Sequence, residues 1–280
     1  MNDLGKIKKY QVSKTTPLGY MLSDGENEYF LHRNESNFRE LAPGDEVEAF
    51  IYSDKKGRLA ATLYLPTMTV DSVGFGTVAA VNKDFGLFLN IGISKDVLLS
   101  ADDLPEDFSD WPRPGDKIAC RLKARGGRLL AKPATKTDFL SLQKITLEEG
   151  TEVTAHVYRK TPSGVNLVTE DFNVIFVYKE HLKKEYRLGE KAEVLISGKG
   201  RDDYYGIIPL DKEKQAASDR EKILEYLKKM DGAMAITEKS DAIVIKKVFD
   251  MSKRAFKAAL ASLEKEGIIE IQEDKVILLV

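Results

Sequence analysis

Two phenylalanines in the segment NKDFGLFLNIG, residues 82–92, are the side chains best suited to binding chemistry. Phe85 and Phe88 flank Gly86 beside two charged residues, where a polar turn is expected. In an unbroken strand, residues three apart point to opposite faces, whereas a bulge or kink at Gly86 would place both rings on one face. Exposed rings can stack on the π faces of nucleic-acid bases, a contribution of roughly 1–3 kcal/mol per base. The alternative is that both rings fill the end of a barrel or a contact between domains.

The phosphates that accompany stacked bases need cations nearby. The same region supplies Lys83 at the turn and four further cations on a later strand and its hairpin, namely Arg121, Lys123, Arg125 and Arg128. Alternation along that strand predicts core-facing positions at Ile118, Cys120, Leu122 and Ala124. The outward row is then Ala119, Arg121, Lys123 and Arg125. The sequence therefore predicts basic side chains near the two rings.

The composition is that of a folded protein outside the membrane. At 280 residues, the length of the chain suggests roughly two domains, and its 42% hydrophobic and 31% charged residues fit a folded protein rather than a disordered one. No apolar run approaches the roughly 20 residues that span a bilayer, and the first residues lack the apolar core of a signal peptide. The single cysteine, Cys120, excludes an intrachain disulfide scaffold and favours a reducing cytoplasm.

Catalytic and metal-binding motifs are missing from the sequence. The three histidines, His32, His156 and His181, are far apart and form no metal-ligand motif. No P-loop, GxSxG or HExxH pattern occurs. We therefore expect a protein that is not an enzyme and uses neither a metal nor a cofactor.

Charge does not mark the chain as a general polyanion binder. Its 43 basic and 45 acidic residues give a net charge of −2. By segment, the net charge is −1 for residues 1–66, +1 for 67–137, −3 for 138–213 and +1 for 214–280. Contacts with nucleic acid must therefore come from local patches.

A weak internal repeat divides the chain. PGDEVEAFIYSDKKGRLAATL from Pro43 resembles PGDKIACRLKARGGRLLAKPA from Pro114, and LGEKAEVLISGKGRDDYYGIIPL from Leu188 is a weaker copy. A glycine lies 39 residues before each turn glycine, at Gly5, Gly76 and Gly150. Each unit predicts five short strands in about 65 residues, which suits a small closed barrel because closure removes exposed strand edges.

The pattern becomes helical after about residue 213. SDREKILEYLKKM predicts one amphipathic helix, and Ser252 is suited to cap a second helix that Gly267 ends. A helix around residues 240–249, DAIVIKKVF, is also expected, although its β-branched residues suit a strand equally well. Two short strands, GIIEIQ and KVILLV, follow. Helices followed by a terminal hairpin describe a winged helix-turn-helix.

The stretch GTVAAVNKDFGLFLNIG, with DVLLSADDL and PGDKIACRLKARGGRLLAK after it, resembles the S1 RNA-binding domain, a five-stranded OB-type barrel. Three such units before a winged helix resemble the conserved virulence factor B family of bacterial RNA-binding regulators. The resemblance implies a mainly β protein with a C-terminal α+β domain. It implies S1-like barrels at residues 1–66, 67–137 and 138–213, of which the first and third are degenerate, and a winged helix at 214–280.

In S1 domains, a phenylalanine pair around a glycine and a histidine about a dozen residues later form the nucleic-acid face. Phe85 and Phe88 match the pair in the second unit, but its histidine position is Ser100. The first unit has Leu18 and Met21 at the pair, Tyr20 between them and His32 at the histidine position, whereas the third has Ser163, Asn166 and Tyr178. No unit has the full set. Tyr20 and His32 are candidates to extend an RNA track, although a lone histidine is more often structural.

Other candidate residues lie on the equivalent outward rows and on the winged helix. The outward rows of the first and third units are not basic, and we expect Phe50 and Leu195 to pack against a neighbouring domain. Lys253, Arg254 and Lys257 begin the helix capped by Ser252 and could contact phosphates or a major groove. Nearby acidic residues dilute their charge, so a merely solvated helix face is the alternative.

These features together predict a cytoplasmic, non-catalytic RNA-binding regulator of bacterial gene expression, including virulence genes. The second unit would stack single-stranded bases on Phe85 and Phe88 while its arginines hold the backbone. Two alternatives stay open. One is a DNA-binding regulator led by the winged helix, and the other is a protein–protein adaptor that uses the exposed aromatic residues.

Overall fold

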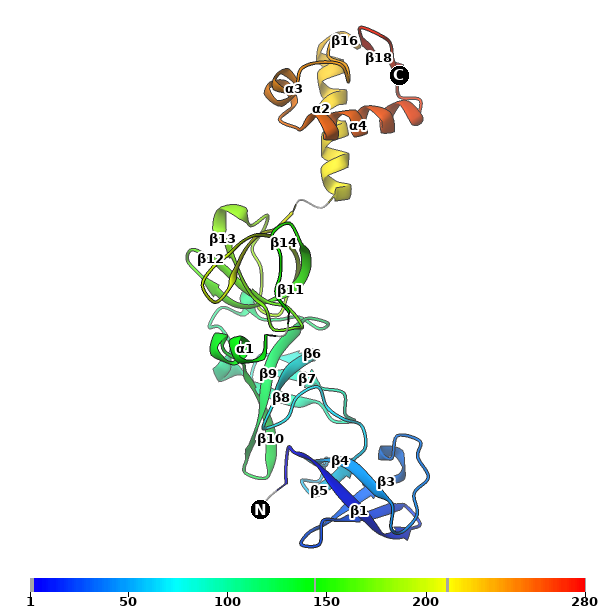
Figure 1. Cartoon of the computed structure of the whole chain (residues 1–280), viewed down its shortest axis with the longest axis vertical. Helices are drawn as coiled ribbons and strands as arrows, with labels where there is room; N and C mark the ends of the chain where they lie inside the picture. The colour runs from blue at the N-terminus through cyan, green and yellow to red at the C-terminus, as the bar shows by residue number, and fades with distance from the viewer. Residues whose placement is uncertain (1–2, 144, 210–211, 280) are drawn as a thin grey trace. The chain divides into compact units, whose positions relative to one another are not determined.

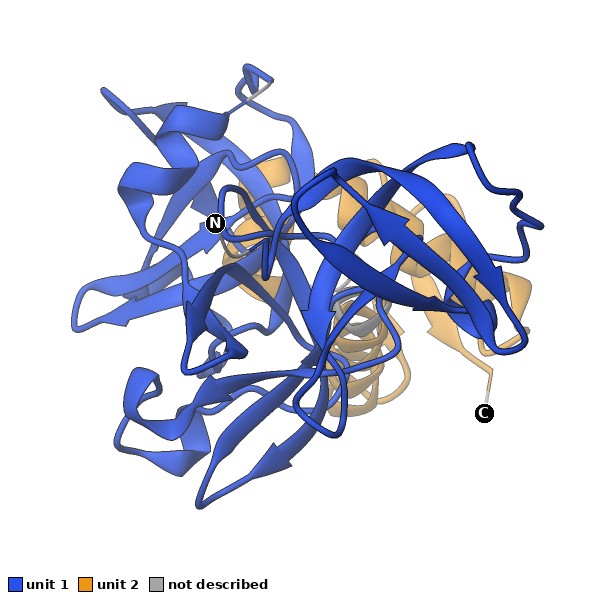
Figure 2. Ribbon diagram, turned by 90° about the horizontal axis from the view of Figure 1, so that it is seen from below, with its two compact units in different colours: residues 1–208 blue, residues 209–280 orange. Residues whose placement is uncertain are grey.

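The computed structural model describes residues 3–143, 145–209 and 212–279 and divides into two compact units, residues 1–208 and 209–280 (Figures 1 and 2). The first unit consists of three closed barrels, and the second has the helices and small sheet of a winged helix domain. The structure thus confirms the predicted fold class. Within the described ranges, no helix combines the length and apolar character needed to cross a membrane.

Each barrel has five strands in the same order, with the fifth strand paired in parallel to the third and antiparallel to the fourth. The first barrel has β1 (Ile7–Thr16), β2 (Gly19–Ser23), β3 (Glu28–His32), β4 (Glu46–Ser53) and β5 (Leu59–Thr62). The second has β6 (Val73–Asn82), β7 (Gly86–Asn90), β8 (Val97–Ser100), β9 (Lys117–Arg125) and β10 (Arg128–Pro133). The third has β11 (Glu152–Thr161), β12 (Gly164–Val168), β13 (Val174–Tyr178), β14 (Lys191–Lys199) and β15 (Tyr204–Ile207). A 3-10 helix follows the third strand of each barrel, at η1 (Arg33–Glu35), η2 (Ala101–Asp103) and η4 (Lys179–His181), and η3 (Phe108–Asp110) is an addition in the second.

A repeated backbone bond closes each barrel. The glycine in the turn before the fourth strand donates its N–H to a valine carbonyl on the long first strand, in the pairs Gly44–Val12, Gly115–Val78 and Gly189–Val157, at 2.9, 2.9 and 2.7 Å. Immediately after this valine, the pairing of the first and second strands shifts register in all three barrels. The bulge therefore bends the first strand at the same point of each repeat, so that it can pair with both of its neighbours.

These bonds correct the glycine spacing read from the sequence. Gly44 and Gly189 each follow their valine by 32 residues, whereas Gly115 follows Val78 by 37. Gly5 and Gly150 both precede their valine by seven residues, which makes Asp71, not Gly76, the equivalent position in the second barrel. The spacing of 39 at Gly76 was a coincidence, because the second barrel has a longer connection that includes η3.

Burial confirms most of the alternation predicted for β9. Cys120 and Leu122 are buried and Ile118 is partly buried against the same core, but Ala124 is exposed and Ala119 is buried. Ala124 lies beyond the core, beside the turn into β10. Ala119 faces outward as predicted, but an apolar cluster that includes Phe139, Val168, Phe172 and Val174 covers it. The outward face of β9 is thus buried at Ala119 by the contact between the second and third barrels.

The first and second barrels share an apolar core. Phe50 and Tyr52 of β4, 0% and 7% exposed, belong to the cluster that fills the second barrel. This confirms the predicted packing of Phe50 against a neighbouring domain. Gly5 adds a backbone bond, because its carbonyl accepts the N–H of Val70 at 3.0 Å. Leu195 is half-buried, and its packing against a neighbour remains a prediction.

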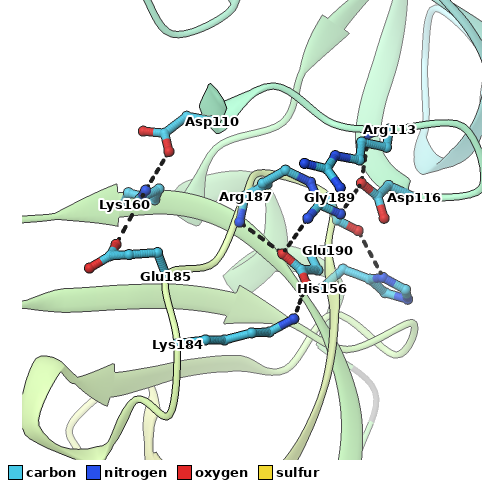
Figure 3. Close-up of polar contacts among 10 residues, drawn as sticks. All are labelled: Asp110, Arg113, Asp116, His156, Lys160, Lys184, Glu185, Arg187, Gly189 and Glu190. Carbon is cyan, nitrogen blue, oxygen red and sulfur yellow. Dashed lines mark hydrogen bonds and ion pairs between the residues drawn. The ribbon is translucent and has the colours of Figure 1, made fainter. Parts of the chain in front are cut away.

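Polar contacts join the second and third barrels (Figure 3). The Arg187 guanidinium lies 3.3 Å from the Asp116 carboxylate and 3.2 Å from that of Glu190, and Lys184 also pairs with Glu190. The Gly189 carbonyl accepts the N–H of Lys117 at 3.1 Å. Burial alone would raise the pKa of Glu190, but the backbone hydrogen bond of Arg187 and the Lys184 ammonium outweigh it and hold the pKa low. The charged network therefore fixes the turn of the third barrel against the second.

A helix that the sequence analysis did not predict covers this joint. Helix α1 (Lys136–Leu142) begins with a capping box in which Thr135 and Asp138 bond reciprocally. The Phe139 ring is fully buried in the inter-barrel cluster, 4.9 Å from the Tyr158 ring centroid. The pattern T-x-x-D before an apolar residue was the available signal.

The second unit confirms the predicted winged helix. It contains α2 (Lys212–Lys229), β16 (Ala233–Met234), α3 (Ala242–Phe249), α4 (Lys253–Lys265), β17 (Ile269–Ile271) and β18 (Val276–Leu278), and its sheet order is β16-β18-β17. Ser252 caps α4 as predicted, because its hydroxyl accepts the N–H of Ala255 at 3.2 Å. Asp241 caps α3 and so resolves its ambiguous sequence in favour of a helix, with Ile245 and Phe249 buried one turn apart. The predicted boundary at 213/214 falls inside α2, and the four domain ranges remain predictions.

His156 lies at the joint between the second and third barrels, with its ring centroid 5.6 Å from that of Phe75, and we expect it to make this joint sensitive to pH. Its Nδ1–H lies 3.4 Å from the Gly189 carbonyl, and burial lowers its pKa from 6.5. A lowered folded-state pKa gives stability that is fully present above about pH 6.5 and is lost as the pH falls from there through the folded pKa. We expect His156→Gln to reduce the loss of amide protection in β11 and β14 between about pH 7.5 and pH 5, as measured by hydrogen exchange. Equal losses in both proteins would contradict this role.

Gly5 tests the contact between the first and second barrels. It has φ +84°, and a Cβ there would lie 2.5 Å from Val70 Cγ1 and 2.8 Å from a Leu129 methyl carbon. Gly44, with φ +99°, has open space around it and serves as the matched control. We expect Gly44→Ala to cost about 1–2 kcal/mol of unfolding free energy from its backbone alone, and Gly5→Ala about 1–3 kcal/mol more. Denaturant unfolding measures the difference, and equal costs would show that this contact carries little stability.

Candidate nucleic-acid interface

The turn before β7 presents Phe85 to solvent. The Asn82 side-chain oxygen accepts the N–H groups of Asp84 and Phe85 at 2.9 and 3.1 Å, which fixes the turn. Gly86 has φ +121°, and a Cβ there would lie 2.0 Å from the Leu99 carbonyl oxygen, so only glycine allows this close approach of strands. The Phe85 ring is 61% exposed as a result.

Gly86 is not the bulge that the sequence analysis considered. It is the first residue of β7, and the bulge of this barrel lies on β6 between Val78 and Ala80. The two phenylalanines therefore have different settings, because Phe85 belongs to the turn and Phe88 to the strand. Phe88 is half-buried, and its register partners across β8 and β10 are Leu98 and then Leu130. The three side chains form an apolar row across the barrel surface.

The predicted cations divide into free and paired groups. Lys83 is exposed, with its ammonium 4.4 Å from the centroid of the Phe108 ring. Arg121 forms an ion pair with Asp138 of α1, so its charge is already neutralised. The other three, Lys123, Arg125 and Arg128, are exposed and form no ion pair with a described residue. These three side chains therefore remain available to phosphates.

The first barrel contradicts the expectation for Tyr20. Its ring is 4% exposed within the barrel core, and its hydroxyl accepts the Leu41 N–H at 3.3 Å. A ring enclosed in this way cannot stack on a base, and the physical reason is strand alternation. Tyr20 follows Gly19 on β2 and points inward, as Leu87 does after Gly86 in the second barrel. His32 is exposed, and its Nδ1 accepts the Asn34 N–H at 3.1 Å.

Strand pairing shows that the aligned positions are equivalent in space. The glycine of each pair lies opposite the histidine position on the next strand, in the pairs Gly19–His32, Gly86–Ser100 and Gly164–Tyr178. The residue at this position precedes a 3-10 helix in every barrel. The three barrels therefore present one face built to the same plan with different side chains.

The third barrel has an aromatic cluster that the sequence analysis missed. The rings of Tyr178 and Tyr205, 43% and 38% exposed, are stacked with centroids 6.0 Å apart, and Phe176 meets Tyr178 edge-on at 4.9 Å. Phe176 lies directly beside Tyr205 on the parallel strand β15. Alternation was the available signal, because Phe176 precedes the histidine position by two residues and so shares its face.

The winged helix exposes two of its three predicted contact residues without an ion pair to any residue that the structure describes. Lys253 and Arg254 are exposed in the first turn of α4 and form no ion pair with a described residue. Lys257 lies 3.1 Å from Glu238, and Lys246 of α3 lies 2.6 Å from Asp250. Helix α3 also exposes Ile243 at 76%. The described part of the chain contains no group of three potential metal ligands.

A cleft of about 400 Å³ adjoins the apolar row of the second barrel. Phe88, Leu98 and Leu130 lie on one side of it, and residues 52–57 of the first barrel lie on the other. Lys95 spans the two sides, because its ammonium donates to the carbonyl oxygens of Ser53 and Asp54 at 2.6 and 3.1 Å. Burial lowers the pKa of Lys95 from its ordinary value, although Asp54 acts in the opposite direction.

Comparison with known proteins agrees with this architecture. The S1 domain family matches residues 4–64, the CvfB first S1-like domain matches residues 73–132, and the CvfB-like winged helix domain matches residues 221–278. A crystal structure of a multidomain protein with nucleic acid binding domains from Streptococcus pneumoniae TIGR4 aligns over 99% of both chains, with 28% identity and a TM-score of 0.64.

Two relatives match almost the whole chain. The uncharacterized protein YitL of Bacillus subtilis is 36% identical over 94% of this chain and 89% of its own length. Conserved virulence factor B of Staphylococcus aureus is 32% identical over 98% of this chain and 94% of its own length. With three closed barrels, two of which match S1 models, the matching winged helix and this coverage, the chain belongs to the conserved virulence factor B family.

Proposed function

We propose that the protein is a non-catalytic regulator that binds single-stranded RNA in the cytoplasm and controls bacterial gene expression, including virulence genes. The observation that carries the proposal is the Phe85 ring, which is 61% exposed on a turn fixed by Asn82. A fixed exposed ring loses little conformational freedom when a base stacks on it. Neither a metal nor a cofactor enters the proposal.

The cations that serve this platform are those that form no ion pair with a described residue. Lys123, Arg125 and Arg128 follow β9 and its hairpin into β10 and are available to phosphates, and Lys83 is exposed beside Phe85. Arg121 is held by Asp138 and takes no direct part. The stacked Tyr178 and Tyr205 rings of the third barrel form a second platform. Linked weak sites raise the overall affinity when a strand can engage them together.

In the first barrel and the winged helix, the contacts proposed are with the exposed side chains. His32 offers a ring at the position that Tyr178 occupies in the third barrel. Lys253 and Arg254 at the start of α4 suit phosphate contacts, and Lys257 joins them only if it leaves Glu238. The same helix start is where a DNA duplex would bind if the winged helix led recognition.

Replacement of both phenylalanines tests the platform. We expect Phe85→Ala with Phe88→Ala to weaken single-stranded RNA binding by roughly 2 kcal/mol or more, about 30-fold, because two stacking surfaces are removed. Phe38 of the first barrel, 96% exposed, gives the control variant Phe38→Ala. Fluorescence anisotropy with a labelled RNA panel at two salt concentrations measures the affinities.

Each alternative has its own outcome in this experiment. If RNA binding weakened equally in the control and in the double variant, Phe85 and Phe88 would not be the stacking platform. Duplex DNA that competes better than single-stranded RNA would favour a DNA-binding regulator led by the winged helix. A wild-type protein that binds neither, or binds without dependence on salt, would favour an adaptor that uses its exposed aromatic residues on protein partners.

A comparison of two arginines of the second barrel tests the choice of cations. Arg128→Ala is expected to weaken RNA binding and to reduce the slope of log K against log salt by about 0.7, the value for one phosphate of a single strand that is no longer neutralised. Arg121→Ala is expected to leave that slope unchanged, because Asp138 already neutralises the guanidinium. The measurement is a salt titration of binding for both variants. A slope reduced by Arg121→Ala alone would reverse the assignment.

A further inference from the structure

The apolar row of the second barrel forms the floor of the cleft described above. Phe88, Leu98 and Leu130 lie side by side on three neighbouring strands, and all three are half-buried, so they still reach solvent. The cleft holds about 400 Å³, a volume within the range of small-ligand sites. Its floor is therefore a flat apolar surface of limited size with one aromatic ring.

The opposite wall is the β4–β5 hairpin of the first barrel, and this hairpin is rigid. The Asp54 carboxylate accepts the N–H groups of Lys56 and Arg58 at 2.8 and 2.9 Å, and the Arg58 guanidinium also donates to it. The ammonium of Lys95 bonds to the carbonyl groups at the start of the turn. The backbone of the hairpin is thus tied to the second barrel, and its turn lines the cleft.

The lining of the cleft favours an anion. Four cations, Lys55, Lys56, Lys95 and Arg128, face two carboxylates, Asp54 and Asp96. Asp54 is occupied by the turn and by Arg58, and Lys95 by two carbonyl groups. Lys55, Lys56 and Arg128 form no ion pair within the described ranges, and only Asp96 opposes them. Three free cations therefore lie beside an apolar floor.

We infer that this cleft binds one nucleotide of a single-stranded RNA, with the base against Phe88 and the phosphate between Lys55, Lys56 and Arg128. A nucleotide combines a flat apolar face with an adjacent negative charge, which is the complement of this floor and wall. The inference rests on the proposed function and adds that the first barrel supplies half of a site whose other half is the second. The degenerate first barrel thus contributes its hairpin to a shared site, in addition to the contact proposed for His32.

A pair of double variants tests the wall of the cleft. Lys55→Ala with Lys56→Ala removes the two hairpin cations, and Lys9→Ala with Arg39→Ala removes two exposed cations of the same barrel outside the cleft. Both changes alter the net charge equally, so general attraction cancels. We expect the hairpin variant alone to bind single-stranded RNA about tenfold more weakly at low salt, with a salt slope shallower by about 0.7 for each phosphate that the hairpin no longer neutralises. Equal behaviour of the two variants would overturn the inference.

Photochemical cross-linking locates the RNA without altering the cleft. With an oligonucleotide that contains 4-thiouridine, we expect mass spectrometry to find cross-links both on the strand that carries Phe88 and on the hairpin around Lys56. Cross-links that include the Phe85 turn but never the hairpin would overturn the shared site. A free mononucleotide has the same chemistry, so uridine monophosphate is added as a competitor. If uridine monophosphate displaced the RNA at equal concentration, the ligand of the cleft would be a free nucleotide and not an RNA strand.

The failures of the two proposals can be told apart. If the wild-type protein binds no RNA, or if replacement of Phe85 and Phe88 has no effect, the proposed function fails. If those replacements weaken binding while the hairpin variant matches its control, the second barrel binds RNA alone and only the shared cleft fails.

Discussion

The burial of Phe50 and Tyr52 in the core of the second barrel is the contact on which the shared surface of the first two barrels depends. Both side chains belong to β4, whose other face encloses the core of the first barrel. One strand therefore serves two cores, and the two barrels cannot turn relative to each other without exposing large apolar side chains to water. The bonds of Lys95 to the hairpin that follows β4 extend the same constraint to the rim of the cleft.

Local patterns predicted the folds of the barrels and of the winged helix well. The repeated turn glycine, the strand alternation and the capping serine at Ser252 each act over a few residues, so they can be read from the sequence alone. Gly76 shows how such patterns fail, because equal spacing does not imply an equivalent position when a connection lengthens. Helix α1 was missed although its capping box was present, since a seven-residue helix between two barrels offers little periodicity.

The candidate site was harder to predict because the exposure and ion pairing of its side chains depend on contacts between residues that are distant in sequence. Arg121 and Lys123 look alike in sequence, but Asp138 neutralises the first and no described carboxylate pairs with the second. Tyr20 was a plausible surface ring until strand register placed it inward. Conversely, Tyr178 and Tyr205 are 27 residues apart and stack only because β13 and β15 pair in parallel. Ion pairing and register of this kind are properties of the folded chain.

The way β4 is shared also has a consequence for synthesis of the protein. Domains fold in order as a chain leaves the ribosome, and the N-terminal barrel is complete by about residue 62. The cluster that covers Phe50 and Tyr52 includes residues as late as Ala131. For the time needed to translate the intervening segment, the nascent first barrel carries two uncovered aromatic side chains on its surface. The apolar surface around Phe50 and Tyr52 is therefore covered only after the second barrel has been synthesised.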